Sequence, residues 1–213
     1  MLWTLETLRR HGLRATDGSI GRIGDLYFDD YTWTVRYVVV DTGNWLTGRT
    51  VLIAPSALGP PDEQAQEFPV ALTRAQIEQA PGIDRDKPVN RQQEIGLVDY
   101  FGWQAWWKDG QELPVEVARL QSAEGDPNLR SAADAVGYAI AAVDGEIGSV
   151  SDFLTNPEDW RIRRIVLDTG SWLSDRQVML MPDQIRQIDW AERTVRVDLS
   201  REQIRNSPPD RLS

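Results

Sequence analysis

Two short segments carry the residue types that could do chemistry: VVVDTGNWL at residues 38–46 and IVLDTGSWL at residues 165–173. Each segment places an Asp-Thr-Gly triplet directly after an apolar run. Two carboxylates that lie close together cannot both ionise, so one stays protonated while the other activates a water molecule. Asp41 and Asp168 are therefore a candidate pair for acid–base hydrolysis of a peptide bond.

The residues around the triplets do not support this aspartic-protease interpretation. A protease dyad needs two lobes that meet at the triplets, an apolar-apolar-Gly segment behind each triplet, and a flap over the cleft. In this sequence each triplet is followed, after one residue, by Trp-Leu, and Arg49 or Arg176 comes three residues later. We predict that the chain has no catalytic residues and is not an enzyme.

A structural interpretation accounts for more of these residues. An Asp at the end of a strand accepts backbone N–H groups of the following turn, and Gly permits a positive φ there. The Trp can fold over an open barrel end. The Arg lies at the start of the next strand, which runs back past the Asp, so the two can form a salt bridge. This predicted structural corner occurs twice: at Asp41, Gly43, Trp45 and Arg49, and at Asp168, Gly170, Trp172 and Arg176.

An internal repeat supplies the elements that position these corners. When the chain is shifted by 127 positions against itself, residues 17–81 align with residues 144–208 without a gap. Such self-similarity has to be interpreted before any local motif. The identical pairs include Asp17/Asp144, Gly21/Gly148, Asp25/Asp152, Trp33/Trp160, Arg36/Arg163 and Pro55/Pro182. The sequence therefore indicates a tandem duplication with a connector between the copies.

Each copy is typical of short strands. Asp17-Gly18 and Asp144-Gly145 lie between strand-like runs and are strong hairpin signals. The runs TVRYVVVD and RIRRIVLD are rich in β-branched residues, and Thr73 and Ser200 are suitable N-caps for a short final helix. Short strands of this kind suit a small barrel that hides its edges. We predict an all-β dominated chain: two tandem small barrels with short flanking helices, in a pseudo-twofold arrangement.

These residues resemble the PRC-barrel domain, a family named after the cytoplasmic domain of the photosynthetic reaction centre H subunit. The hairpin Asp-Gly, the strand ending in Asp-Thr-Gly-x-Trp-Leu and the strand ending in Pro carry the resemblance in both copies. It implies a first barrel at residues 1–81, a Trp-rich connector at residues 82–128 and a second barrel at residues 129–213. It also implies a bacterial protein-contact module without a family-wide catalytic site. A reaction-centre-H-like role in photosynthetic electron transport is the alternative within this resemblance.

Composition narrows the function classes. The 213-residue chain has a formal net charge of −10, which argues against a nucleic-acid partner because phosphate contacts need clustered Lys and Arg. It has no Cys, which excludes disulfides and thiolate metal sites and fits a reducing compartment. No run approaches the roughly 20 apolar residues that span a bilayer. We expect a cytoplasmic protein with no membrane span.

Neither a metal nor a cofactor is expected. His11 is the single histidine, and its counterpart in the repeat is Tyr138, which predicts a packing role. Asp84, Asp86 and Asn90 have part of the spacing of a calcium loop, but Val89 stands where that loop requires Gly.

Two groups of residues are candidates for binding. Trp103, Trp106 and Trp107 either anchor the connector against the barrels or form an exposed patch for a partner or a quinone-like ligand. Arg161 and Arg164 flank the repeat residue Arg163 and could meet an acidic partner. We predict a non-enzymatic adaptor that binds another protein, with a homodimer left open. The alternative is a binder of a hydrophobic small molecule or quinone.

Overall fold

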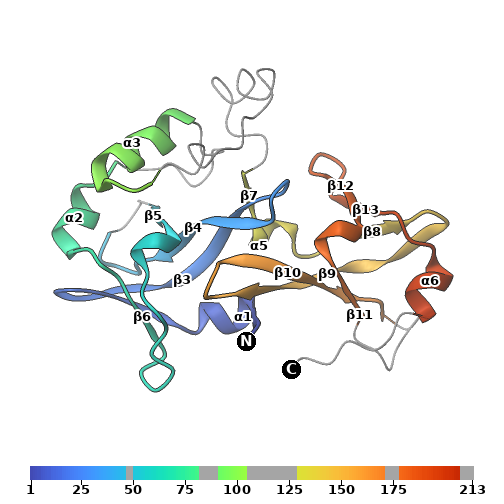
Figure 1. The fold of residues 1–213 in the computed structure, drawn as a ribbon, viewed down its shortest axis with the longest axis horizontal. Helices are drawn as coiled ribbons and strands as arrows, with labels where there is room; N and C mark the ends of the chain where they lie inside the picture. The colour runs from blue at the N-terminus through green and yellow to red at the C-terminus, as the bar shows by residue number, and fades with distance from the viewer. Residues whose placement is uncertain (47–49, 82–90, 105–128, 171–177, 207–213) are drawn as a thin grey trace.

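The computed structural model describes residues 1–46, 50–81, 91–104, 129–170 and 178–206 (Figure 1). We call residues 1–81 the first half and residues 129–206 the second half. The predicted site residues outside the described ranges are Arg49, Trp106, Trp107, Trp172 and Arg176. The calcium-loop residues Asp84, Asp86 and Asn90 also lie outside them.

The first half consists of strands of 2 to 12 residues and helices of 3 to 6 residues. In chain order its elements are β1 (Trp3–Thr4), α1 (Leu5–Arg9), β2 (Gly12–Ala15), β3 (Gly18–Asp29), β4 (Thr34–Asp41), β5 (Val51–Ile53), the 3-10 helix η1 (Pro55–Ala57), β6 (Glu67–Pro69) and α2 (Arg74–Gln79). Thr73 caps α2, because its hydroxyl accepts the N–H of Gln76 and the Gln76 side chain bonds back to the Thr73 backbone. The connector then forms α3 (Arg91–Phe101).

The second half repeats this order with one additional strand, β12. Its elements are β7 (Leu129–Ser131), α5 (Ala132–Ala135), β8 (Ala139–Ala142), β9 (Gly145–Asn156), β10 (Arg161–Asp168), β11 (Val178–Leu180), the 3-10 helix η4 (Pro182–Gln184), β12 (Ile185–Asp189), β13 (Thr194–Val197) and α6 (Arg201–Asn206). The pairs β3 and β9, β4 and β10, and β5 and β11 begin 127 residues apart and have equal lengths. The periodicity found in the sequence is therefore also a periodicity of secondary structure.

The described strands pair into one curled sheet. Its main path runs β12, β13, β8, β9, β10, β4, β3, β2, β6, and β5 and β11 pair with β4 and β10. Most pairs are antiparallel, but β2 with β6 and β8 with β13 are parallel, so the sheet is mixed. The β-dominated fold with short helices agrees with the sequence prediction. The strand pairing joins the two halves in a single sheet.

The junction between the halves is narrow. β4 and β10 share the residue pair Thr34 and Arg161, from which the two strands run in opposite directions. The N–H of Val35 donates to the carbonyl of Trp160 at 2.8 Å, and the N–H of Ile162 donates to the carbonyl of Trp33 at 2.9 Å. The contact is reciprocal, because each half supplies one donor and one acceptor.

Each half also receives a strand and a helix from the other. β1 pairs with β9, and β7 pairs with β3. Asp152 on β9 accepts the N–H of Leu5 in α1, and Asp25 on β3 accepts the N–H of Ala133 in α5, both at 2.9 Å. A carboxylate at these positions satisfies backbone donors that the helix itself leaves unpaired. The two halves are interlocked.

The hydrophobic core is continuous across the junction. A single cluster of buried side chains draws on both halves. Within it the Phe28 and Phe153 rings lie 5.6 Å apart, and Trp160 of the second half lies 5.6 Å from Phe68 of the first. Aromatic pairs at this spacing contribute beyond their buried area. The core therefore couples the stability of the two halves.

Candidate binding site at the junction of the two halves

Asp41 and Asp168 lie far from each other. Each ends a strand that starts at the junction, and the two strands run apart from the Thr34–Arg161 pair. At ~3.3 Å per residue, roughly 45 Å of strand separates the two carboxylates. A carboxylate pair that shares a proton is incompatible with this placement.

The Asp and Gly of each predicted corner make a local turn. Asp41 Oδ1 accepts the N–H of Gly43 at 3.1 Å, and Asp168 Oδ1 accepts the N–H of Gly170 at 2.9 Å. Gly43 and Gly170 have φ values of 58° and 56°, which favour glycine. These Asp side chains stabilise the turns that follow β4 and β10.

A second glycine supports each corner, and the sequence analysis did not assign it. A Cβ on Gly21 would lie 2.1 Å from the carbonyl oxygen of Asp41, and a Cβ on Gly148 would lie 2.1 Å from that of Asp168. The backbones approach too closely for any side chain. The identity Gly21/Gly148 in the repeat was the signal that could have revealed this role.

Trp45 is fixed by a neighbour that the sequence analysis did not foresee. Its ring is partly buried against the core, and the guanidinium carbon of Arg74 lies 4.5 Å from the ring centroid. Arg74 begins α2, and its N–H donates to Asp17 at 2.7 Å. The corner, the hairpin turn and the final helix of the first half therefore contact one another.

His11 lies in a packed environment. It is 6% exposed, its Nδ1 donates to the carbonyl of Thr7 at 2.9 Å, and its ring lies 4.6 Å from that of Trp3. Within the described ranges, no group of three or more His, Cys, Asp or Glu side chains is placed to hold a metal ion.

The buried carboxylate of Asp25 and the half-buried carboxylate of Asp152 bind the first residues of α5 and α1. Burial raises the pKa of Asp25, and hydrogen bonds from Ser131 and from the N–H groups of Ala133 and Leu26 oppose that rise. Burial likewise raises the pKa of Asp152. Desolvation outweighs hydrogen bonding at both sites, because each ionised carboxylate has left water for the interior. The identity Asp25/Asp152 in the repeat marked these residues, but their long-range partners were not predictable.

Trp103 anchors the end of the connector helix. α3 stops at Gly102, whose φ is 67°, and the N–H of Trp103 donates to the carbonyl of Val98 at 3.2 Å. This pattern is a Schellman cap, in which Gly adopts the left-handed conformation. The Trp103 ring then stacks on Phe101 at 4.3 Å. Trp103 is partly buried and packs against the core of the first half.

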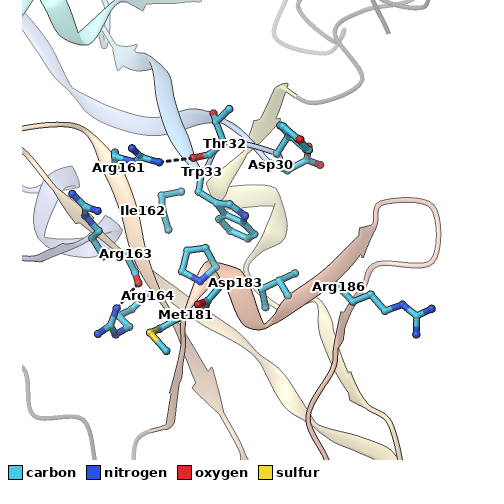
Figure 2. A pocket seen from close by; sticks show the side chains of 13 residues that line it. Asp30, Thr32, Trp33, Arg161, Ile162, Arg163, Arg164, Met181, Asp183 and Arg186 are labelled. Carbon is cyan, nitrogen blue, oxygen red and sulfur yellow. Dashed lines mark hydrogen bonds between the residues drawn. The ribbon is translucent and has the colours of Figure 1, made fainter. Parts of the chain in front are cut away.

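A hollow lies at the junction, and we call it the Arg-lined hollow. Its volume is about 780 Å³. Arg161, Arg163 and Arg164 follow one another along β10 at its wall, whereas the side chain of Arg186 points away from them (Figure 2). Arg161 donates to the carbonyl of Thr32 at 3.4 Å. The structure thus brings the two predicted arginines to one site and adds Arg163.

Apolar and acidic groups complete the Arg-lined hollow. Tyr31 and Met181 line it and are 74% and 39% exposed. Asp30 and Asp183 are also in the lining. Asp30 is held by Trp190 Nε1 at 3.0 Å and by Arg130 Nε at 3.3 Å. The hollow therefore combines apolar contact area with a local excess of positive charge.

The comparisons with known proteins add no relative. No protein-family model matches the chain, and no curated protein matches it. In the part of the chain that the structure describes, no helix combines the length and apolarity needed to cross a membrane. The Arg-lined hollow is therefore the structural feature that best indicates a function.

Proposed function

We propose that this chain is a non-enzymatic protein-binding module built from two PRC-type barrels, and that the Arg-lined hollow is its binding surface. The observation that carries the proposal is the gathering of Arg161, Arg163 and Arg164 at one hollow in a chain of net charge −10. Like charges at one place repel one another. The arginine cluster therefore favours an acidic partner through charge complementarity.

Two further features support a protein as the partner. Tyr31 and Met181 add exposed apolar surface beside the arginines, a combination typical of protein interfaces. The overall negative charge repels nucleic-acid phosphates and anionic membranes at longer range. The repeated element order and the curled, mixed sheet support the PRC-type assignment.

Affinity capture with matched charge-reversal variants tests this proposal. We expect the wild-type protein to capture a specific acidic protein from its native extract, and the Arg161→Glu/Arg164→Glu variant to lose it. Arg196→Glu is the control, because Arg196 is exposed on β13, outside the hollow. Equal capture by wild type and the double variant across growth conditions would contradict the proposal.

A hydrophobic small molecule is the second candidate ligand. A smaller hollow of about 270 Å³ is lined by Trp103, Trp160, Val98 and Pro55. Its lining is mostly apolar, which favours this ligand class, although drug-sized ligands occupy roughly 300–1,000 Å³. Thermal-shift screening with quinones distinguishes the two functions: stabilisation that is lost in Trp103→Ala supports the small-molecule function.

A further inference from the structure

The two hollows occupy equivalent positions in the two halves. Pairs of residues 127 positions apart line both: Trp33 and Trp160, Val35 and Ile162, Pro55 and Pro182. The hollow of the first half differs because the connector enters it with Val98, Trp103 and Gln104. It retains about 270 Å³, whereas the Arg-lined hollow of the second half has about 780 Å³. In the part of the chain that the structure describes, the connector narrows one copy and does not enter the other.

An arginine at a bulge receives the helix in the first half. The register of β3 and β4 shifts at Arg36, which turns its side chain out of the regular alternation. Arg36 forms an ion pair with Asp29 and lies 3.6 Å from the carboxylate of Glu94 in α3. The side chains of all three are 5% exposed or less. Glu94 is thus the charged contact of α3 with the sheet.

Apolar contacts follow one turn later. Leu97, three residues after Glu94, packs in a buried cluster with Tyr37, Val39 and Leu52 of the sheet. The helix also contacts α2, since the Tyr100 hydroxyl donates to the carbonyl of Gln76 at 3.0 Å. In α3, therefore, a carboxylate meets the bulge arginine and an apolar side chain meets the neighbouring strands.

The second half keeps the bulge and changes the charges around it. Arg163 occupies the bulge of β10, but the position of Asp29 is taken by Asn156. Arg163 instead pairs with Asp159 near the surface, and its side chain is 43% exposed. Arg161 and Arg164 replace Thr34 and Tyr37. The Arg-lined hollow thus has the strand and bulge positions that contact α3 in the first half, with two additional arginines.

We propose that the Arg-lined hollow receives an acidic amphipathic helix of a partner protein, seated as α3 is seated in the first half. A carboxylate of that helix contacts Arg163, an apolar residue one turn later contacts the apolar lining, and further carboxylates face Arg161 and Arg164. Charge-assisted contacts to Arg and an apolar helix face are a common mode of peptide recognition. This inference rests on the proposed function and specifies the partner's structure.

A peptide of residues 91–104 of this chain, labelled with a fluorophore, is the direct probe. The intact protein is titrated and binding is followed by fluorescence anisotropy, with a Glu94→Gln peptide in parallel. The first-half hollow stays occupied, because the tethered α3 has a millimolar effective concentration against micromolar peptide. Circular dichroism of each protein variant confirms that it is folded.

The expected result is saturable binding that depends on both charges. Arg163→Glu should raise the Kd at least about tenfold, and Glu94→Gln in the peptide should raise it about fivefold or more, as loss of a close charge pair does. Arg196→Glu should leave the Kd within about twofold, because rim and remote charges contribute little. Higher salt should weaken binding of the wild-type pair.

Three results would overturn the inference. The first is no binding of either peptide by the wild-type protein, and the second is binding unaffected by Arg163→Glu. The third is self-association that Arg163→Glu abolishes in sedimentation, which would make a second copy of the chain the occupant. If the peptide fails while Arg161→Glu/Arg164→Glu still loses the captured protein, the proposed function stands and only the helical partner is wrong.

Discussion

The carbonyl groups of Trp33 and Trp160 each accept a backbone hydrogen bond from the other half across the junction. Both residues have a backbone conformation that is uncommon for tryptophan. Their φ values are 57° and 53°, in the left-handed region, and their side chains are 9% and 6% exposed. Each carbonyl accepts the N–H of the residue that follows the shared Thr34–Arg161 pair in the other half. The burial of two large rings offsets the backbone cost at both turns.

Removing one ring should destabilise both halves together. We expect Trp160→Ala to lower the free energy of unfolding by roughly 3–5 kcal/mol, as for other buried aromatic truncations. Because Trp160 contacts Phe68 of the first half, urea unfolding should remain a single transition by circular dichroism and fluorescence. Tyr31→Ala is the control, since Tyr31 is 74% exposed. Two separate transitions would show that the halves unfold independently.

The two bulge arginines should differ in their contribution to stability. Arg36→Ala leaves the buried carboxylates of Asp29 and Glu94 without their counter-charge, so we expect a loss of roughly 3–5 kcal/mol. Arg163→Ala removes a partly exposed ion pair, so we expect at most about 1 kcal/mol. The side chains of Arg36 and Arg163 are 4% and 43% exposed. Equal losses in chemical denaturation would contradict this assignment.

Close backbone contact should make Gly21 intolerant of any side chain. Gly21→Ala places a Cβ 2.1 Å from the carbonyl oxygen of Asp41, so we expect a loss of stability of at least about 2 kcal/mol. Gly43→Asn is a matched control in the same corner. No atom lies within 4 Å of a Cβ at Gly43, and Asn tolerates a positive φ, so we expect less than about 1 kcal/mol. Similar losses for both variants would show that φ, not contact, limits the corner.

The raised pKa of Asp25 should appear as a pH dependence of stability. Its ionised form is less favourable in the folded protein than in the unfolded chain, because burial removes water from the carboxylate. The wild type should therefore gain stability as pH falls through the raised pKa, with the gain complete below the ordinary value of 3.8.

Comparison with Asp25→Asn isolates this titration, because Asn does not ionise. The difference in unfolding free energy, wild type minus variant, should increase as pH is lowered from 7 towards 4. Asp152→Asn should show the same direction, since burial also raises the pKa of Asp152. A difference that is independent of pH, or that decreases on acidification, would mean that hydrogen bonds from Ser131 and the α5 backbone dominate at Asp25.

Much of the local structure could be predicted from the sequence. The Asp17-Gly18 and Asp144-Gly145 hairpins, the strands β4 and β10, and the cap of α2 at Thr73 follow from residues close in the chain. Such signals are local because turns and caps are satisfied by neighbouring backbone groups. The Asp–Gly turns at Asp41 and Asp168 are of the same kind.

The candidate site was only partly predictable. Arg161 and Arg164 were singled out by charge, but their proximity to Tyr31 and Met181 depends on the Trp33–Trp160 junction. Arg163 belonged to the repeat pattern, and locally it differs from Arg36 in its neighbours Arg161 and Arg164, which replace Thr34 and Tyr37. Its exposure follows from Asn156, which stands in place of Asp29, and from the connector helix α3, which supplies Glu94 to the first half.

The sequence by itself determined the repeat of 127 residues, the β-dominated character of each half and the turns that bound the strands. Tertiary structure decided that β1 and β7 cross to the opposite half, that one core spans both, and that, among the described residues, α3 enters the first hollow and not the second. The physical reason is the separation in sequence between the residues that interact. Periodicity and capping act between neighbouring residues, whereas strand pairing, burial and occupation of a hollow depend on residues far apart in the chain, such as Arg36 with Glu94 or Asp25 with Ala133.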